Sequence, residues 1–94
     1  MILNPKLLIV DDERGIVDMI QSYFQTQYDI LTAYSGQEAL KKVACKPDLI
    51  LLDINMPGMD GLTVCQQIRE HIACPILFLT ARIESVSYTH LRAH

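Results

Sequence analysis

Four short runs along this chain are rich in apolar residues. Between these runs, the apolar residues have a different spacing. Residues 6–10, 48–53 and 76–80 are apolar at nearly every position, which is typical of strands buried on both faces of a parallel sheet. Residues 28–33 form a run that is less apolar, and a strand of that kind is expected nearer an edge of the sheet. The pattern therefore predicts four strands.

Three segments between these runs have apolar residues at intervals of three and four, the period of an amphipathic helix. They are residues 13–24, 35–44 and 62–68. The second segment begins with Ser35 and Glu38 in the S-x-x-E arrangement of a capping box, and Pro47 follows its end. Because strands and helices alternate, the chain is predicted to be an α/β protein, a doubly wound parallel sheet with helices on both faces.

Length and composition restrict the class of protein. The 94 residues, 50% hydrophobic and 20% charged, are typical of one globular domain and exclude a disordered chain. The net charge of −3 argues against a domain that follows nucleic-acid phosphates. The longest uncharged apolar run, residues 75–81, is too short for a bilayer, and the N-terminus lacks a signal-peptide core. We expect a cytoplasmic protein without membrane contact, whose cysteines are reduced thiols rather than metal ligands.

Functional side chains occur where three of the predicted strands end. Asp11 and Asp12 follow the first strand, Asp53 ends the third, and Thr80 ends the fourth. Open parallel sheets bind ligands beyond the carboxyl ends of their strands, so these groups are expected to meet. Three neighbouring carboxylates repel one another and favour a bound cation. Because Mg²⁺ prefers oxygen ligands, the sequence predicts a magnesium site built from carboxylates and a backbone carbonyl.

Asp53 is the candidate nucleophile of this site. A carboxylate beside Mg²⁺ can accept a phosphoryl group and become an aspartyl phosphate. Thr80 and the backbone N–H of Ala81 are the candidate contacts for a phosphoryl oxygen. A single Asp at a strand end more often serves as a cap or turn residue, but functional groups at three strand ends together favour a site.

Three segments of the chain resemble the receiver domain of two-component response regulators. They are residues 7–13 (LLIVDDE), residues 48–61 (DLILLDINMPGMDG) and residues 75–82 (PILFLTAR), in the order and at the intervals of that family. The resemblance implies a flavodoxin-like receiver fold and a bacterial signalling protein. The ending Leu-Thr-Ala-Arg resembles the subclass whose output domain is a DNA-binding winged helix that regulates transcription, and that domain is not among these residues.

The resemblance implies a role for each matching residue. Asp53 matches the phospho-acceptor, which takes a phosphoryl group from the phosphohistidine of a sensor histidine kinase. Asp12 matches the direct Mg²⁺ ligand, Asp11 the neighbour that acts largely through water, and Asn55 the residue whose backbone carbonyl binds the metal. Thr80 matches the hydroxyl that turns toward the phosphoryl group. The family has only this self-phosphorylation chemistry, so the chain is not expected to be an enzyme, and phosphorylation switches its conformation.

The chain departs from the family pattern towards its end. Receivers carry a lysine followed by proline after a fifth strand, whereas the only Lys-Pro here, Lys46-Pro47, precedes the third strand. We expect an incomplete receiver in residues 1–84, with four strands and three helices of the usual five and five. Residues 85–94 resemble translated adapter or vector sequence and are expected to be a non-family tail. Because the fourth strand would then be an unprotected edge, self-association or a homodimer is expected.

Two other functions stay open at this point. One is a receiver-like interaction module that is not phosphorylated, or a fragment without function. The other is a phosphatase with an Asp nucleophile, which also forms an aspartyl phosphate. Such a phosphatase requires a second carboxylate two residues after Asp53 as general acid, and this chain has Asn55 there.

Overall fold

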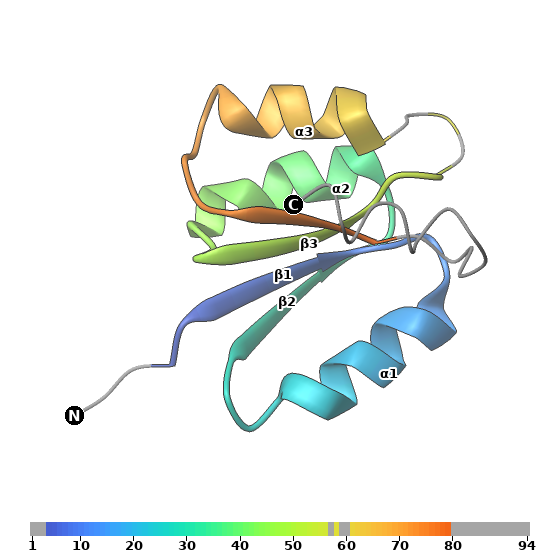
Figure 1. Cartoon of the computed structure of the whole chain (residues 1–94), viewed down its shortest axis with the longest axis vertical. Coiled ribbons are helices and arrows are strands. Elements are labelled where there is room, and N and C mark those ends of the chain that lie inside the picture. The colour runs from blue at the N-terminus through green and yellow to red at the C-terminus, as the bar shows by residue number, and fades with distance from the viewer. Residues whose placement is uncertain (1–3, 57, 59–60, 80–94) are drawn as a thin grey trace, which may run out of the picture.

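A computed structural model of the chain describes residues 4–56, 58 and 61–79. The described residues form one sheet of parallel strands, in the order β2-β1-β3-β4. The strands are β1 (Lys6–Val10), β2 (Asp29–Ala33), β3 (Leu49–Asp53) and β4 (Ile76–Leu79). All four therefore direct their carboxyl ends to the same edge of the sheet (Figure 1).

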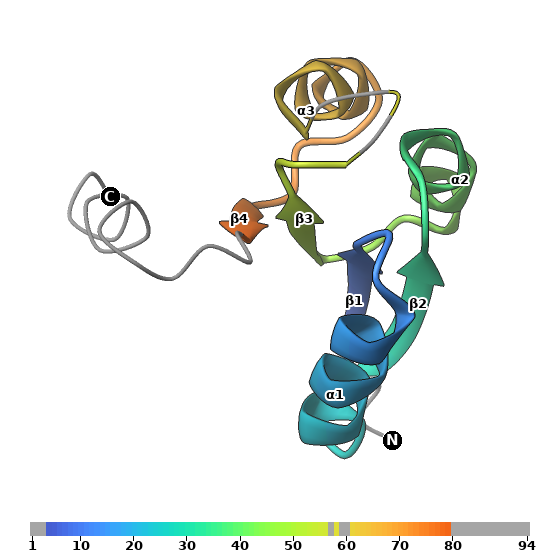
Figure 2. The ribbon, with the colours of Figure 1, turned by 90° about the vertical axis from the view of Figure 1, so that its right-hand side faces the viewer.

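Helices cover both faces of this sheet. They are α1 (Arg14–Phe24), α2 (Gly36–Lys42), which continues into the short 3-10 helix η1 (Val43–Cys45), and α3 (Gly61–Arg69). Figures 1 and 2 show α1 on one face of the sheet and α2 and α3 on the opposite face. The doubly wound α/β architecture that the alternating pattern predicts is thus confirmed.

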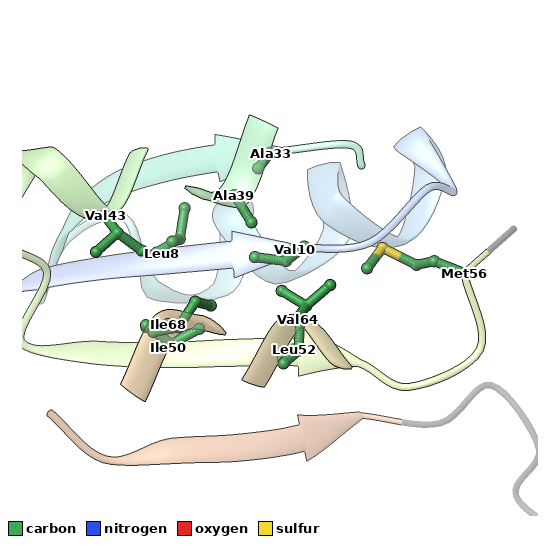
Figure 3. Packing of buried hydrophobic residues seen from close by; sticks show 10 residues of the cluster. All are labelled: Leu8, Val10, Ala33, Ala39, Val43, Ile50, Leu52, Met56, Val64 and Ile68. Carbon is green, nitrogen blue, oxygen red and sulfur yellow. The ribbon is translucent and has the colours of Figure 1, made fainter. Parts of the chain in front are cut away.

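Two apolar clusters, one on each face of the sheet, hold these layers together. The larger lies between the sheet and helices α2 and α3 (Figure 3), and its buried residues are Leu8, Val10, Ala33, Ala39, Val43, Ile50, Leu52, Met56, Val64 and Ile68. The smaller lies under α1 and consists of Leu7, Ile9, Val17 and Leu51. Successive residues of a strand point to opposite faces, so β1 and β3 contribute to both clusters. This is why their sequences are apolar at consecutive positions.

The predicted element boundaries agree with the structure to within a few residues. The type of helix differs at the end of α2. The sequence predicts a helix through residue 44, whereas the α-helix ends at Lys42 and η1 follows. The N–H of Lys46 donates to the carbonyl of Val43 at 2.9 Å, and Lys46 has a left-handed backbone with φ of 58°. A tightened last turn of this kind satisfies carbonyls that a helix end leaves unpaired.

Several predictions fall outside the described residues. They concern Thr80, Ala81, the boundary between residues 84 and 85, and the tail 85–94. None of the helices in the described ranges is long and apolar enough to span a bilayer. All three cysteines are free thiols, as expected from their spacing.

Candidate functional site

The candidate site lies where the strand order of the sheet reverses. The chain passes from β1 to its neighbour β2 on one side, and then returns to β3 on the other side of β1. The connections after β1 and β3 therefore diverge to opposite faces, and the carboxyl ends of two such strands are the place where open parallel sheets bind ligands. Asp11 and Asp12 directly follow β1, and Asp53 is the last residue of β3.

The three aspartates meet at this edge of the sheet. One carboxylate oxygen of Asp11, one of Asp12 and one of Asp53 lie within 4.8 Å of one another. The side chains differ in exposure: Asp11 is 3% exposed and Asp53 is 5% exposed, whereas Asp12 is exposed to solvent. We call these three residues the acidic cluster. Its formation was expected from the strand ends alone.

Local backbone hydrogen bonds orient the two buried carboxylates. The N–H of Glu13 donates to Oδ1 of Asp11 at 3.0 Å, and the N–H of Asn55 donates to Oδ1 of Asp53 at 3.0 Å. In both cases an aspartate side chain accepts from the residue two positions later, the arrangement that Asp favours in turns. Each carboxylate is therefore held by the turn that ends its own strand.

The electrostatics of the cluster are most visible at Asp11. Burial raises the pKa of this carboxyl from 3.8 to about 6, although the hydrogen bond from the N–H of Glu13 acts in the opposite direction. The negative charge of Asp53, a hydrogen bond with its side chain and the charge of Asp12 are smaller contributions to the same rise of the pKa to about 6. Without a cation, the folded protein thus holds a proton at Asp11 more tightly than the unfolded chain does.

The donors of this cluster fit a hard divalent cation. Mg²⁺ binds oxygen ligands, keeps several waters, and is usually held by one or two carboxylates rather than a complete protein cage. Two buried carboxylates beside an exposed one, with Asn55 at the surface two residues after Asp53, provide such an open set of oxygens. Burial is the main cause of the raised pKa of Asp11, and a cation there would relieve the charge repulsion that adds to it.

The start of α3 packs closely against the backbone of this site. The N–H of Gly61 donates to the carbonyl of Ile54 at 3.1 Å. A Cβ atom at position 61 would lie 2.7 Å from the carbonyl oxygen of Asp53 and would overlap the Cα of Ile54. Only glycine allows this approach, so the glycine that ends the loop motif packs the helix directly against the chain beside Asp53.

The structure adds two residues that the sequence did not single out. The guanidinium of Arg14, in the first turn of α1, lies 4.0 Å from the centre of the Tyr34 ring. Tyr34 follows β2 immediately, so both residues lie at the same edge of the sheet as the acidic cluster. Their positions are 20 apart along the chain, and no local pattern connects them.

Comparison with known proteins agrees with the fold. The family model for the response regulator receiver domain matches residues 7–92. The chain belongs to this family. The match extends past residue 84, where the sequence alone suggested a boundary, and that boundary is not among the described residues.

Curated relatives of this receiver are transcriptional regulatory proteins. The alkaline phosphatase synthesis transcriptional regulatory protein PhoP of Bacillus subtilis is 48% identical over 85 residues, which are 87% of this chain and 35% of that protein. The transcriptional regulatory protein YvrH of the same organism is 50% identical over 82 residues, 84% of this chain and 35% of that protein. The chain thus spans about a third of the length of these relatives.

Solved receiver structures have the same fold. The Vibrio cholerae chemotaxis protein CheY4 superposes with a TM-score of 0.79 at 33% identity, covering 96% of this chain and 79% of that one. The N-terminal receiver domain of Klebsiella pneumoniae RstA, solved in a BeF3-activated form, gives a TM-score of 0.77 at 31% identity, with 94% and 77% covered. The flavodoxin-like receiver fold expected from the motifs is therefore confirmed.

Proposed function

We propose that Asp53 is the residue of this receiver that accepts a phosphoryl group. The observation that carries the proposal is the placement of its buried carboxylate at the end of β3, beside Asp11 and Asp12. The hydrogen bond from the N–H of Asn55 to Oδ1 of Asp53 holds that carboxylate in one orientation, which favours attack on an incoming group.

In the proposed reaction, a carboxylate oxygen of Asp53 attacks the phosphorus of a phosphohistidine on a sensor histidine kinase. A bond forms between that oxygen and phosphorus, and the bond between phosphorus and the imidazole nitrogen breaks. The electron pair of the broken bond remains on the imidazole, which takes up a proton from solvent. The product is an aspartyl phosphate on the receiver and a free histidine on the kinase.

The acidic cluster is proposed to hold Mg²⁺ during this transfer, through Asp11, Asp12, Asp53 and the backbone carbonyl of Asn55. When bound, this cation would neutralise part of the charge that the carboxylates and the phosphoryl oxygens bring together. Thr80 and the backbone N–H of Ala81, outside the described residues, are proposed to contact the phosphoryl oxygens. The hydrogen bonds from Glu13 and Asn55 keep the buried carboxylates in place before any ligand arrives.

Phosphorylation is proposed to switch the conformation of the receiver and so control an output domain that acts in transcription. Support for this step comes from the relatives, which are named as transcriptional regulatory proteins and are much longer than this chain. A winged-helix output domain that binds DNA, and a cytoplasmic location, belong to the same proposal. So does the assignment of residues 1–84 to the receiver and of residues 85–94 to a tail.

The experiment that tests the proposal is incubation of the chain with acetyl phosphate and MgCl2, followed by intact-mass spectrometry. We expect the mass to increase by one phosphoryl group, with loss of the label in hydroxylamine, which cleaves acyl phosphates. Asp53→Asn should abolish the label, and chelation of Mg²⁺ should prevent it. The matched control is Asp18→Asn, which changes an exposed aspartate of α1 that is not a member of the acidic cluster and should leave labelling unchanged.

Two results would contradict the proposal. Continuous release of inorganic phosphate without a stable label would indicate a phosphatase instead of a receiver. No labelling with either acetyl phosphate or a phosphorylated histidine kinase would leave an interaction module without phosphorylation.

A further inference from the structure

Positive charge is distributed unevenly between the edge of the sheet where the strands begin and the edge where they end. Six of the eight Lys and Arg residues lie in the described part of the chain, and Arg82 and Arg92 lie outside it. Five of the six are at the edge opposite the acidic cluster: where β1 begins, where α2 and α3 end, and just before β3. These are Lys6, Lys41, Lys42, Lys46 and Arg69. Among the described residues, Arg14 is therefore the only Lys or Arg at the edge that carries the acidic cluster.

Arg14 follows the acidic cluster closely in sequence, and its side chain contacts Tyr34. It lies two residues after Asp12, so the two Cα atoms are at most about 7 Å apart. Its guanidinium lies 4.0 Å from the centre of the Tyr34 ring, within the range of a cation–π contact. Such a contact orients the guanidinium and leaves its N–H groups free to turn toward an anion.

Tyr34 is itself anchored beside the acidic cluster. Its side chain packs against the apolar cluster under α1, and its N–H donates to Oε1 of Glu38 at 2.9 Å. The preceding residue, Ala33, accepts a hydrogen bond from the N–H of Asp11 at 3.1 Å. The ring is thus fixed by β2, directly alongside the strand end that carries Asp11.

The charge of Arg14 is not neutralised by a neighbour. Four acidic residues lie within four positions of it in sequence, yet the guanidinium forms no salt bridge with any carboxylate of the described residues. They are Asp11, Asp12, Glu13 and Asp18. An arginine that only stabilised α1 would be expected to pair with Asp18, four residues later on the same helix. Stacking on Tyr34 keeps the positive charge at the rim of the site.

We propose that Arg14, held by Tyr34, is a positioning residue that attracts the anionic phosphoryl donor to an edge whose other charged side chains, among the described residues, are carboxylates. This inference rests on the proposed function and adds a source of donor attraction within the chain itself. The same charge must repel a cation, so Arg14 raises the affinity for the donor and lowers the affinity for Mg²⁺. The two effects have opposite signs, which a merely structural role of Arg14 would not produce.

The test compares Arg14→Gln with the native chain in two measurements at low ionic strength. At saturating MgCl2, the rate of labelling by acetyl phosphate should fall about threefold in the variant. In titration calorimetry with MgCl2 alone, the variant should bind Mg²⁺ about threefold more tightly. Both differences should shrink in 1 M salt, where the Debye length is only about 3 Å. Lys41→Gln is the matched control, because it removes the same charge from an exposed position at the opposite edge.

The contribution of the ring is tested with two substitutions of Tyr34. Tyr34→Phe keeps the aromatic face and should behave as the native chain. Tyr34→Leu removes the face and should lower the labelling rate in the same direction as Arg14→Gln, with circular dichroism confirming that the fold is retained.

Three results would overturn the inference. If the native chain is labelled but Arg14→Gln changes neither rate nor Mg²⁺ affinity, the inference fails and the proposed function stands. If both fall together, Arg14 supports the structure of the site rather than the approach of the donor. If the native chain is not labelled at all, the proposed function fails, and the inference fails with it.

Discussion

At the scale of single residues, the acidic cluster works against the stability of the metal-free fold. Asp11 is buried with two other carboxylates nearby, and its pKa of about 6 lies above the value of 3.8 that it has without such surroundings. Between these two pH values, the folded state binds more protons than the unfolded state. The free energy of unfolding therefore falls as the pH rises from about 4 to about 6.

This sign predicts the effect of Asp11→Asn. The variant carries no charge at this position, so in metal-free buffer above pH 6 it should be more stable than the native chain. The difference should disappear near pH 4, where Asp11 is protonated. Thermal unfolding across pH 4–8 measures this, since each kcal/mol moves the Tm of a domain of this size by about 4–8 °C.

Two controls complete the measurement. Asp18→Asn, at an exposed position of α1, retains Asp11, so its Tm should follow that of the native chain across this pH range. Addition of MgCl2 should raise the Tm of the native chain more than that of Asp11→Asn, because the variant lacks one of the proposed Mg²⁺-binding carboxylates and a ligand stabilises the folded state only as far as it binds. An Asp11→Asn variant less stable than the native chain at pH 7 without metal would contradict the prediction.

At the scale of elements, two helices begin in ways that matter for the site. Ser35 caps α2: its Oγ accepts the N–H of Glu38 at 3.1 Å, while Oε1 of Glu38 accepts the N–H of Tyr34. In the usual capping box the glutamate returns to the N–H of the cap residue itself, whereas here it reaches one residue further. The glutamate therefore ties α2 to the end of β2. Helix α3 instead begins with Gly61, pressed against the backbone beside Asp53.

We expect Ser35→Ala to lower the free energy of unfolding by about 1 kcal/mol, the typical cost of losing a cap. Urea unfolding followed by circular dichroism gives this value. The matched control is Ser22→Ala in α1, an exposed helical position where alanine should be neutral or slightly stabilising. Equal effects at both positions would show that Ser35 has no capping role.

We expect Gly61→Ala to be destabilising by about 1–3 kcal/mol, because the added methyl group can be accommodated only by moving backbone. The movement would displace the chain at Asp53, so phosphorylation should slow as well. Gly15→Ala is the matched control: it lies in α1 with no atom within 4 Å of the new Cβ. That variant should gain about 0.5–1 kcal/mol of stability from the higher helix propensity of alanine.

At the scale of the whole molecule, the two outermost strands of the described sheet, β2 and β4, differ in composition. The edge strand β2 is partly polar, whereas β4 exposes apolar side chains: Leu77 is 53% exposed and Phe78 37%. Leu77 is in register with Leu51 of β3, which belongs to the apolar cluster under α1, but Leu77 itself does not pack against that cluster. An apolar edge strand of this kind is a template for pairing with another chain.

We propose that the chain self-associates through β4, and that Leu77→Lys shifts it toward the monomer. Sedimentation velocity over a range of concentrations measures the distribution of species. The control is Leu62→Lys, which places the same charge at another exposed leucine, 62% exposed, on α3. A chain that remains monomeric at all concentrations, or equal effects of the two substitutions, would contradict the proposal.

Much of the fold could be predicted from sequence because its signals are local. The consecutive apolar residues of β1 and β3 reflect burial on both faces, and the mixed composition of β2 reflects its place at an edge. The end of α2 was predicted less well. Whether a last turn is α or 3-10 depends on hydrogen bonds such as that from Lys46 to Val43, which leave no periodic trace in the sequence.

For the site, the apolar pattern along the chain was enough to predict where the strands end, and hence that Asp11, Asp12 and Asp53 share one edge. Tertiary structure alone decided that their oxygens lie within 4.8 Å, that Asp11 and Asp53 are buried while Asp12 is exposed, and that Arg14 stacks on Tyr34. The difference arises because these features depend on interactions between residues at different separations along the chain. A strand and its final residue are set by neighbouring residues. The order β2-β1-β3-β4, which brings the ends of β1, β2 and β3 together, is set by packing between distant segments.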